Sequence, residues 1–172
     1  DTLIHVANGV HENCPNDEMR SNFELPDFIK KMDKKKWLGD KTKQGFYKKS
    51  KDANGKRIIE ALNLNTFEYK AIKKVKFATI GIAKQENDLK KRLKILISGK
   101  DKAGEFYRKS FYSAFTYISH RIPEITNDLY KIDRALCAGF GWKMGPFQMW
   151  DALEVEKTLS KMEEEGYKAA DW

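Results

Sequence analysis

Cysteine is scarce in this sequence of 172 residues, which contains only Cys14 and Cys137, far apart in the chain. Two thiols without a framework of further cysteines favour a reducing compartment over a secreted protein. The first residues also lack the basic segment and the apolar stretch of a signal peptide. We therefore expect a cytoplasmic protein. The absence of an initiator Met suggests a processed chain or a fragment.

Long apolar runs are absent as well, since no stretch approaches the roughly 18 residues that a membrane-spanning helix requires. The sequence predicts no membrane span. Hydrophobic residues make up 41% and charged residues 34% of the chain, which is typical of a globular protein rather than a disordered one. The length allows one domain with a substantial core, or two small ones.

Complete catalytic and metal-binding motifs are also missing. The three histidines are His5, His11 and His120. His5 and His11 are six residues apart and do not share a helix face as an i, i+4 metal pair does, so we predict no metal site. No nucleophile motif, Gly-rich dinucleotide fingerprint or phosphate loop is present. We therefore assign no catalytic residue.

Positive charge is plentiful: the net charge is +8, and lysine carries most of it in short runs. A basic surface can bind nucleic acid or an anionic cofactor, or it can simply keep a protein soluble. Arginine is scarce and no nucleic-acid motif is visible, so solvated helix faces are the favoured interpretation. A nucleic-acid-binding domain remains a minor alternative, which predicts steeply salt-dependent binding.

Apolar residues recur with helical spacing at both ends of the chain. The pattern predicts helices in residues 2–13, 26–32, 81–97, 101–122, 123–136 and 155–165. Residues 50–79 differ: Asn54-Gly55 is a turn signal, and a hairpin or extended connector is expected, with buried candidates at Ile59, Leu62, Leu64 and Phe67.

The predicted fold class is therefore mostly α, with an irregular connector containing short strands. Three segments are expected: residues 1–50 form one helical part, residues 51–79 form the connector, and residues 80–172 form a second helical part.

Three polar residues allow both a functional and a structural interpretation, and a fourth is an expected helix cap. Lys41 lies in the Gly-flanked loop GDKTKQGF and either reaches a phosphate or is a solvated surface lysine. Asp133 is more simply an ion pair or a helix cap than an acid–base group, and Asp151 is more simply a turn cap. Asp101 is an expected helix N-cap.

The stretch FGWKMGPFQMW, residues 140–150, is too apolar for a solvated loop and contains too many breakers for one helix. We expect Phe140, Trp142, Phe147 and Trp150 to pack in a core around a Gly-Pro turn.

Two stretches together resemble a known family. WLGDKTKQGFYKK resembles the G-x-K-T-G-x-G-F-Y motif in the C-terminal helical domain of 3-hydroxyacyl-CoA dehydrogenases. RIPEITNDLYKIDRALCAGFGWKMGPFQMWDAL resembles the Ile-Asp, Gly-rich turn and Gly-Pro-Phe of the same domain. The resemblance implies a piece of a multifunctional β-oxidation protein with two copies of this domain, the first lacking its front half and the second running from about Gly104.

The resemblance also implies a function. The family oxidises the 3-hydroxyl of an acyl-CoA with NAD, using a histidine and a glutamate of an upstream dinucleotide-binding domain. The helical region closes the cleft over acyl-CoA and cofactor, Lys41 reaches the cofactor, and the stripes on residues 107–122 and 125–136 form a helical interface or a homo-oligomer contact. Lys43 departs from the family, which has glycine there. The chain alone is then inactive; the alternative is a purely structural or dimerisation module in which Lys41 binds nothing.

Overall fold

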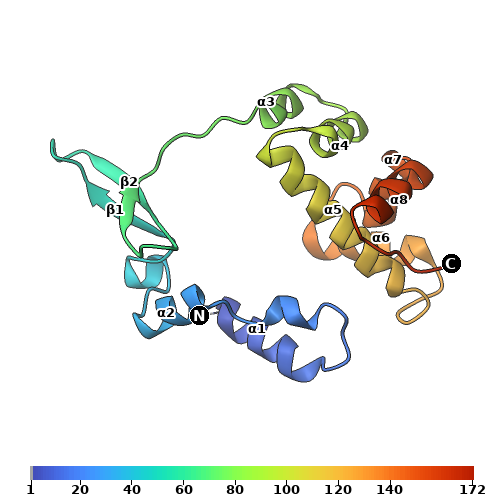
Figure 1. Ribbon diagram of the computed structural model, residues 1–172, viewed down its shortest axis with the longest axis horizontal. Helices are drawn as coiled ribbons and strands as arrows, with labels where there is room; N and C mark the ends of the chain where they lie inside the picture. The colour runs from blue at the N-terminus through green and yellow to red at the C-terminus, as the bar shows by residue number, and fades with distance from the viewer. Residues whose placement is uncertain (1) are drawn as a thin grey trace. The chain divides into compact units, whose positions relative to one another are not determined.

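The computed structural model describes residues 2–172 and divides the chain into two compact units, residues 1–74 and residues 75–172 (Figure 1). Each unit has a core of its own. The architecture is mostly α with one small sheet, which confirms the predicted fold class. The expected segment boundaries at residues 50 and 79 stay a prediction.

The first unit begins with helices and ends in a three-stranded antiparallel sheet of order β1-β2-β3. Its elements are α1 (Thr2–Asn13), the short 3-10 helices η1 (Arg20–Phe23) and η2 (Asp40–Thr42), α2 (Asp27–Lys34), β1 (Tyr47–Lys51), β2 (Arg57–Leu62) and β3 (Tyr69–Ala71).

The hairpin between β1 and β2 turns at Asn54-Gly55, as predicted. The carboxylate of Asp52 accepts hydrogen bonds from the backbone N–H groups of Asn54 and Lys56, both at 2.9 Å. Gly55 has φ +76°, a left-handed conformation that glycine adopts without steric cost. A side-chain-stabilised turn therefore fixes the register of the two strands.

Ile29 and Met32 of α2 and Leu62 of β2 form the core of the first unit. The prediction that Ile59 and Leu64 are buried is wrong, since they are 52% and 41% exposed. Successive side chains of a strand point to opposite faces. Ile59, three residues from Leu62, therefore lies on the other face of the sheet, and Leu64 follows the end of β2.

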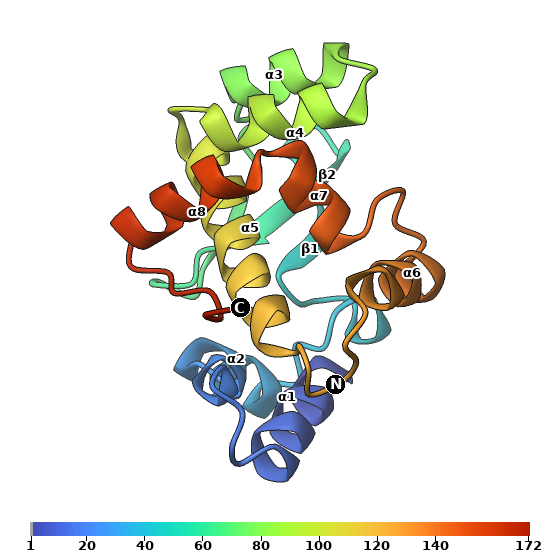
Figure 2. The same cartoon turned by 90° about the vertical axis from the view of Figure 1, so that its right-hand side faces the viewer.

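The second unit consists of helices, which are α3 (Ala78–Gln85), α4 (Leu89–Ser98), α5 (Lys102–His120), α6 (Leu129–Phe140), α7 (Pro146–Ala152) and α8 (Val155–Glu164). Both α4 and α7 pack against α5 (Figure 2). Phe115 of α5 stacks on Trp150 of α7 with ring centroids 4.9 Å apart. The apolar stripe predicted on α5 thus faces the core of its own unit. Within residues 2–172, no helix combines the length and the apolar character needed to cross a membrane.

The helix predicted from Pro123 begins only at Leu129, and Ile125 is 68% exposed. The Thr126 hydroxyl accepts a hydrogen bond from the backbone N–H of Asp128 at 3.2 Å. Such local side-chain bonds compete with helical ones. The chain therefore stays in turns until Asp128, which precedes the first helical residue.

The Gly-Pro turn of residues 140–150 is built around a buried carboxylate. Asp133 of α6 is 5% exposed and accepts hydrogen bonds from the backbone N–H groups of Phe147 at 2.8 Å and Gln148 at 3.2 Å. These amides belong to the first turn of α7, where a helix has no internal acceptors for its N–H groups. Asp133 is thus a helix cap, as expected, although it caps a neighbouring helix.

Glycine is required at position 145 because α7 begins directly against α6. A Cβ atom built on Gly145 would lie 2.4 Å from the Cα atom of Asp133, far inside van der Waals contact. Pro146 then takes the first helical position, where its missing N–H costs no hydrogen bond. The turn is therefore a close helix–helix junction.

Only half of the predicted aromatic packing is found. Phe147 and Trp150 are buried, whereas Phe140 is 72% and Trp142 is 43% exposed. The first turn of α7 is held at Asp133, two helical turns before α6 ends at Phe140. Phe140 and Trp142 lie beyond this contact and pair with each other at 6.0 Å between ring centroids.

We predict that Gly145→Ala lowers the free energy of unfolding by about 2 kcal/mol, the cost of forcing extra atoms into a closely packed site. The matched control is Gly139→Ala in α6, where nothing lies within 4 Å of the added Cβ. That substitution should stabilise the chain by about 1 kcal/mol through helix propensity. Urea unfolding measures both, and equal effects of the two substitutions would contradict the close contact.

The Asp101 carboxylate is the N-cap of α5, as predicted. Its oxygens accept hydrogen bonds from the backbone N–H groups of Gly104 and Thr79, both at 3.0 Å, and of Ala103 at 3.1 Å. These backbone bonds, led by that of Gly104, hold the pKa of Asp101 below its ordinary value. One carboxylate thus joins the start of α5 to the start of α3.

A lowered pKa makes stability depend on pH in a defined direction. The contribution of Asp101 is complete above the unfolded pKa of about 3.9 and is lost as the pH falls through the lower folded value. Asp101→Asn should therefore lower the Tm at pH 7, and the difference from the wild type should shrink as the pH falls below the unfolded pKa of about 3.9. Circular dichroism across this pH range, with the exposed Asp151→Asn as control, tests the prediction. A difference that stays constant with pH would count against it.

Candidate functional site: a lysine loop between helix and sheet

The loop that carries Lys41 connects α2 to β1 and closes on itself. The backbone N–H of Gly39 donates to the carbonyl of Gln44 at 2.9 Å, and the N–H of Gln44 donates back to Gly39 at 3.0 Å. Lys41 lies between them in η2, and its side chain is exposed. The loop thus presents this lysine from a closed ring of backbone bonds.

Thr42 links the two ends of the loop through its side chain. Its hydroxyl oxygen accepts a hydrogen bond from the backbone N–H of Leu38 at 3.0 Å and lies 3.1 Å from the carbonyl oxygen of Gln44. One side chain thereby joins the entry of the loop to its exit. Hydroxyl side chains in such turns satisfy backbone groups that no helix or strand can reach.

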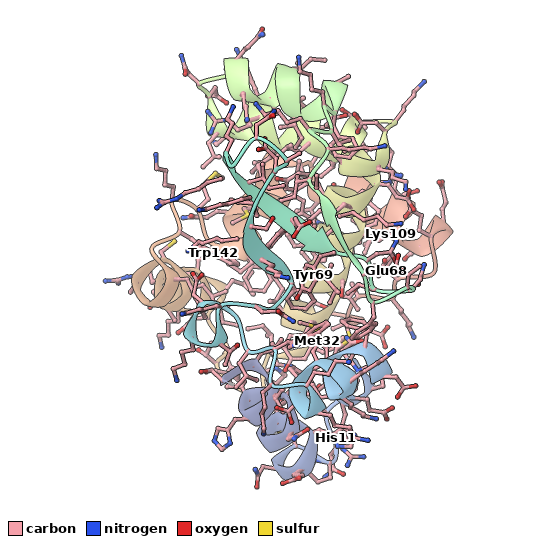
Figure 3. All side chains as sticks on the ribbon, turned by 90° about the vertical axis from the view of Figure 1, so that its left-hand side faces the viewer. His11, Met32, Glu68, Tyr69, Lys109 and Trp142 are labelled. Atoms are coloured by element: carbon pink, nitrogen blue, oxygen red, sulfur yellow. The ribbon has the colours of Figure 1, made fainter. Side chains whose placement is uncertain are left out.

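Gly45 closes the loop through direct backbone contact. A Cβ atom at this position would lie 2.8 Å from both the Cα and the N atoms of Gly39. The Tyr69 hydroxyl donates a hydrogen bond of 2.5 Å to the carbonyl of Gly45 from β3. Burial raises the pKa of Tyr69, against the opposing effect of this bond. Figure 3 shows Tyr69 on the sheet and Met32 in α2, the two elements that the loop connects.

Lys43 preserves the backbone shape at the point where the sequence departs from the family motif. Its φ is +62°, in the left-handed region that favours glycine. The chain therefore adopts here the conformation that a glycine would adopt most readily, and adds a second exposed cation. Nearby, Asp40 pairs with Lys49 of β1 at 3.1 Å.

The other polar residues singled out in the sequence do not join this loop. His11 lies 3.7 Å from Glu24, while the Nε2 atom of His120 lies 3.1 Å from the carbonyl oxygen of Lys168 in the other unit. No three His, Cys, Asp or Glu side chains in the described part of the chain are grouped as metal ligands. Cys14 and Cys137 are free thiols.

The sequence predicts Lys41 as a site residue, which stays a prediction, and it gives no direct signal for the residues that support its loop. Tyr69 follows Gly45 by 24 residues, and its contact depends on the pairing of β2 with β3. The predicted hairpin indicates part of this contact, because a hairpin brings the chain that follows β1 back toward the loop. The third strand itself had no distinctive pattern.

Comparison with curated proteins gives a full-length match. The chain is 37% identical over all of its 172 residues to a probable 3-hydroxyacyl-CoA dehydrogenase of Bacillus subtilis, of which it spans 21%. The chain is therefore homologous to about one fifth of a protein with that name. No family model matches the chain, and no solved structure matches it.

Two further relatives of the chain are putative fatty acid oxidation complex trifunctional enzymes. The one from Rickettsia felis is 29% identical over 134 residues, which is 78% of this chain and 17% of that protein. The one from Rickettsia prowazekii is 30% identical over 112 residues, or 65% of this chain and 14% of that protein. The chain therefore spans about a fifth or less of the curated relatives that it matches.

We predict that Tyr69→Phe destabilises the first unit by about 1 kcal/mol, the usual net contribution of one hydrogen bond. The Tyr69 hydroxyl is the donor that ties β3 to Gly45. Tyr47→Phe, at a residue that is 63% exposed, is the matched control and should change little. Amide hydrogen exchange at Gly39 and Gln44 should accelerate in Tyr69→Phe only; unchanged exchange would show that the loop does not depend on the sheet.

Proposed function

We propose that this chain is the C-terminal helical region of an NAD-dependent 3-hydroxyacyl-CoA dehydrogenase of fatty-acid β-oxidation, located in the cytoplasm. The observation that carries the proposal is the 37% identity to the Bacillus subtilis protein over the whole chain. The region closes a cleft over acyl-CoA and NAD that an upstream dinucleotide-binding domain begins. Its exposed apolar helix faces are then contacts with the rest of the enzyme or with a second copy.

Within this proposal Lys41 binds the cofactor through charge. The chain has no glycine-rich dinucleotide fingerprint, so its residues fit one edge of NAD rather than the whole cofactor. An exposed ammonium on a closed loop suits a phosphate oxygen, because the loop holds the lysine backbone in place before binding. When bound, NAD supplies the hydride acceptor of the oxidation.

The chain's own residues contribute binding and water exclusion rather than proton transfer. No histidine lies in the lysine loop, and we assign no catalytic residue to the chain. The histidine and glutamate of the family mechanism are placed in the upstream domain. Closure of a cleft by a helical region expels water and strengthens charge interactions inside it.

The second candidate function is a structural or dimerisation module in which Lys41 has no ligand. The exposed rings of Phe140 and Trp142, 72% and 43% exposed, favour it, because adjacent large apolar side chains commonly mark a contact surface. This function predicts that assembly, but not cofactor affinity, depends on the chain.

Lys41→Ala in the longer enzyme distinguishes the two functions. We expect about a tenfold rise in the KM for NAD with little change in kcat, since a charge-assisted contact made equally before and during the reaction is lost. The measurement is the steady-state rate with a 3-hydroxyacyl-CoA at varied NAD.

Lys43→Gly is the matched control, because it also removes one cation from the loop and suits the left-handed backbone at that position. Its KM for NAD should stay close to that of the wild type. Equal rises in the KM for NAD in both variants would show that only the total charge of the loop matters. An unchanged KM in Lys41→Ala would favour the structural module.

A further inference from the structure

One face of the small sheet is basic and exposed. Directly paired residues of neighbouring strands share a face, and alternate residues along a strand return to it. The register of the three strands therefore gathers one set of side chains, here called the basic face: Tyr47, Lys49, Lys51, Arg57, Ile59, Ala61 and Lys70.

This face is the solvent side of the sheet. Leu62 and Tyr69, which contact the core of the first unit, pair with each other on the opposite face. On the basic face, Tyr47 is 63% and Ile59 is 52% exposed. An aromatic ring and an aliphatic side chain are thus left uncovered among four cations.

The cations at the turn end of the face are not neutralised. Lys51 and Arg57 are direct cross-strand partners, and like charges in that position destabilise a sheet. Neither has a carboxylate within ion-pair distance in residues 2–172, whereas Lys49 pairs with Asp40 and Lys70 with Glu68.

Asp52 follows Lys51 directly in sequence, but its carboxylate is engaged by two backbone N–H groups of the turn. Residues 30–57 as a whole hold eleven lysines and one arginine against three aspartates. Local charge balance therefore does not account for the Lys51–Arg57 pair, and a bound anion would stabilise it.

We infer that the basic face binds the 3′-phosphorylated adenosine diphosphate end of coenzyme A, an inference that rests on the proposed function. Lys51 and Arg57 project from neighbouring strands about 5 Å apart and together reach one phosphate, for which the planar guanidinium of Arg57 provides two parallel donors. This phosphate is the 3′-phosphate of the ribose.

The uncharged part of the face suits the adenine ring. Ile59 lies two residues after Arg57 along β2, on the same face. Tyr47 of β1 is the diagonal neighbour of Ile59 on that face. A flat ring laid over Ile59 therefore meets the Tyr47 ring on one side, while its ribose phosphates meet the cations on the other. Bases commonly stack on aromatic side chains in this way.

The first test is binding of coenzyme A to the 172-residue chain by titration calorimetry at low salt. Lys51→Glu should weaken binding about tenfold, the effect of one charge-assisted contact. It should also raise the Tm, because it places a carboxylate opposite Arg57, so that weaker binding cannot be attributed to unfolding.

The matched control is Lys90→Glu, which makes the same change in net charge on the exposed surface of α4 in the other unit. It should leave the affinity for coenzyme A unchanged. An equal loss of affinity in both variants would show that binding depends only on the net charge of the chain, and would overturn the inference.

The choice of probe tests which nucleotide is recognised. Dephospho-coenzyme A and NAD lack the 3′-phosphate and should bind about tenfold more weakly than coenzyme A, with little further loss in Lys51→Glu. Equal affinity for coenzyme A and dephospho-coenzyme A would overturn the inference, as would tighter binding of single-stranded DNA than of coenzyme A.

A kinetic test separates this inference from the proposed function. In the longer enzyme, Lys51→Glu should raise the KM for acetoacetyl-CoA but not for acetoacetyl-pantetheine, which lacks the nucleotide. An active enzyme whose two KM values are both unchanged overturns the inference alone. An inactive enzyme, with binding of coenzyme A that still depends on Lys51, overturns the proposed function and leaves the site standing.

Discussion

Close backbone approach at glycine is the constraint on which both units depend. In the second unit, Gly145 lets the first turn of α7 meet α6, so that the buried carboxylate of Asp133 can bind the free N–H groups there. In the first unit, Gly45 lets the lysine loop close against Gly39. At both positions a single methyl group would separate the segments and weaken the hydrogen bonds that hold them.

In the lysine loop, such contacts fix the backbone that carries Lys41, the residue that we propose binds the cofactor. Thr42 links the two ends of the loop, and Tyr69 supports it from the sheet. Lys41 is an exposed residue on a hydrogen-bonded backbone, and such a fixed backbone would lower the entropy lost in the proposed binding of a phosphate. The sheet supports the loop with its inner face, through Tyr69, and we propose that its basic face binds coenzyme A.

Local features of the fold were predictable from sequence, and features that depend on a neighbour were not. The helices, the Asn54-Gly55 turn and the Asp101 cap depend on residues close in sequence. The exposure of Phe140 was not predictable, because it follows from where α7 meets α6. At the candidate site, the loop motif singles out Lys41 as a candidate, whereas Tyr69, which bonds the loop at Gly45, comes from a strand with no distinctive pattern.

We propose that this chain completes a 3-hydroxyacyl-CoA dehydrogenase. The most direct measurement is the oxidation of NADH by acetoacetyl-CoA, followed by absorbance, with the longer enzyme and with the 172-residue chain side by side. We expect turnover by the longer enzyme and none by the chain alone. A folded longer enzyme without activity, or turnover by the isolated chain, would contradict the proposal.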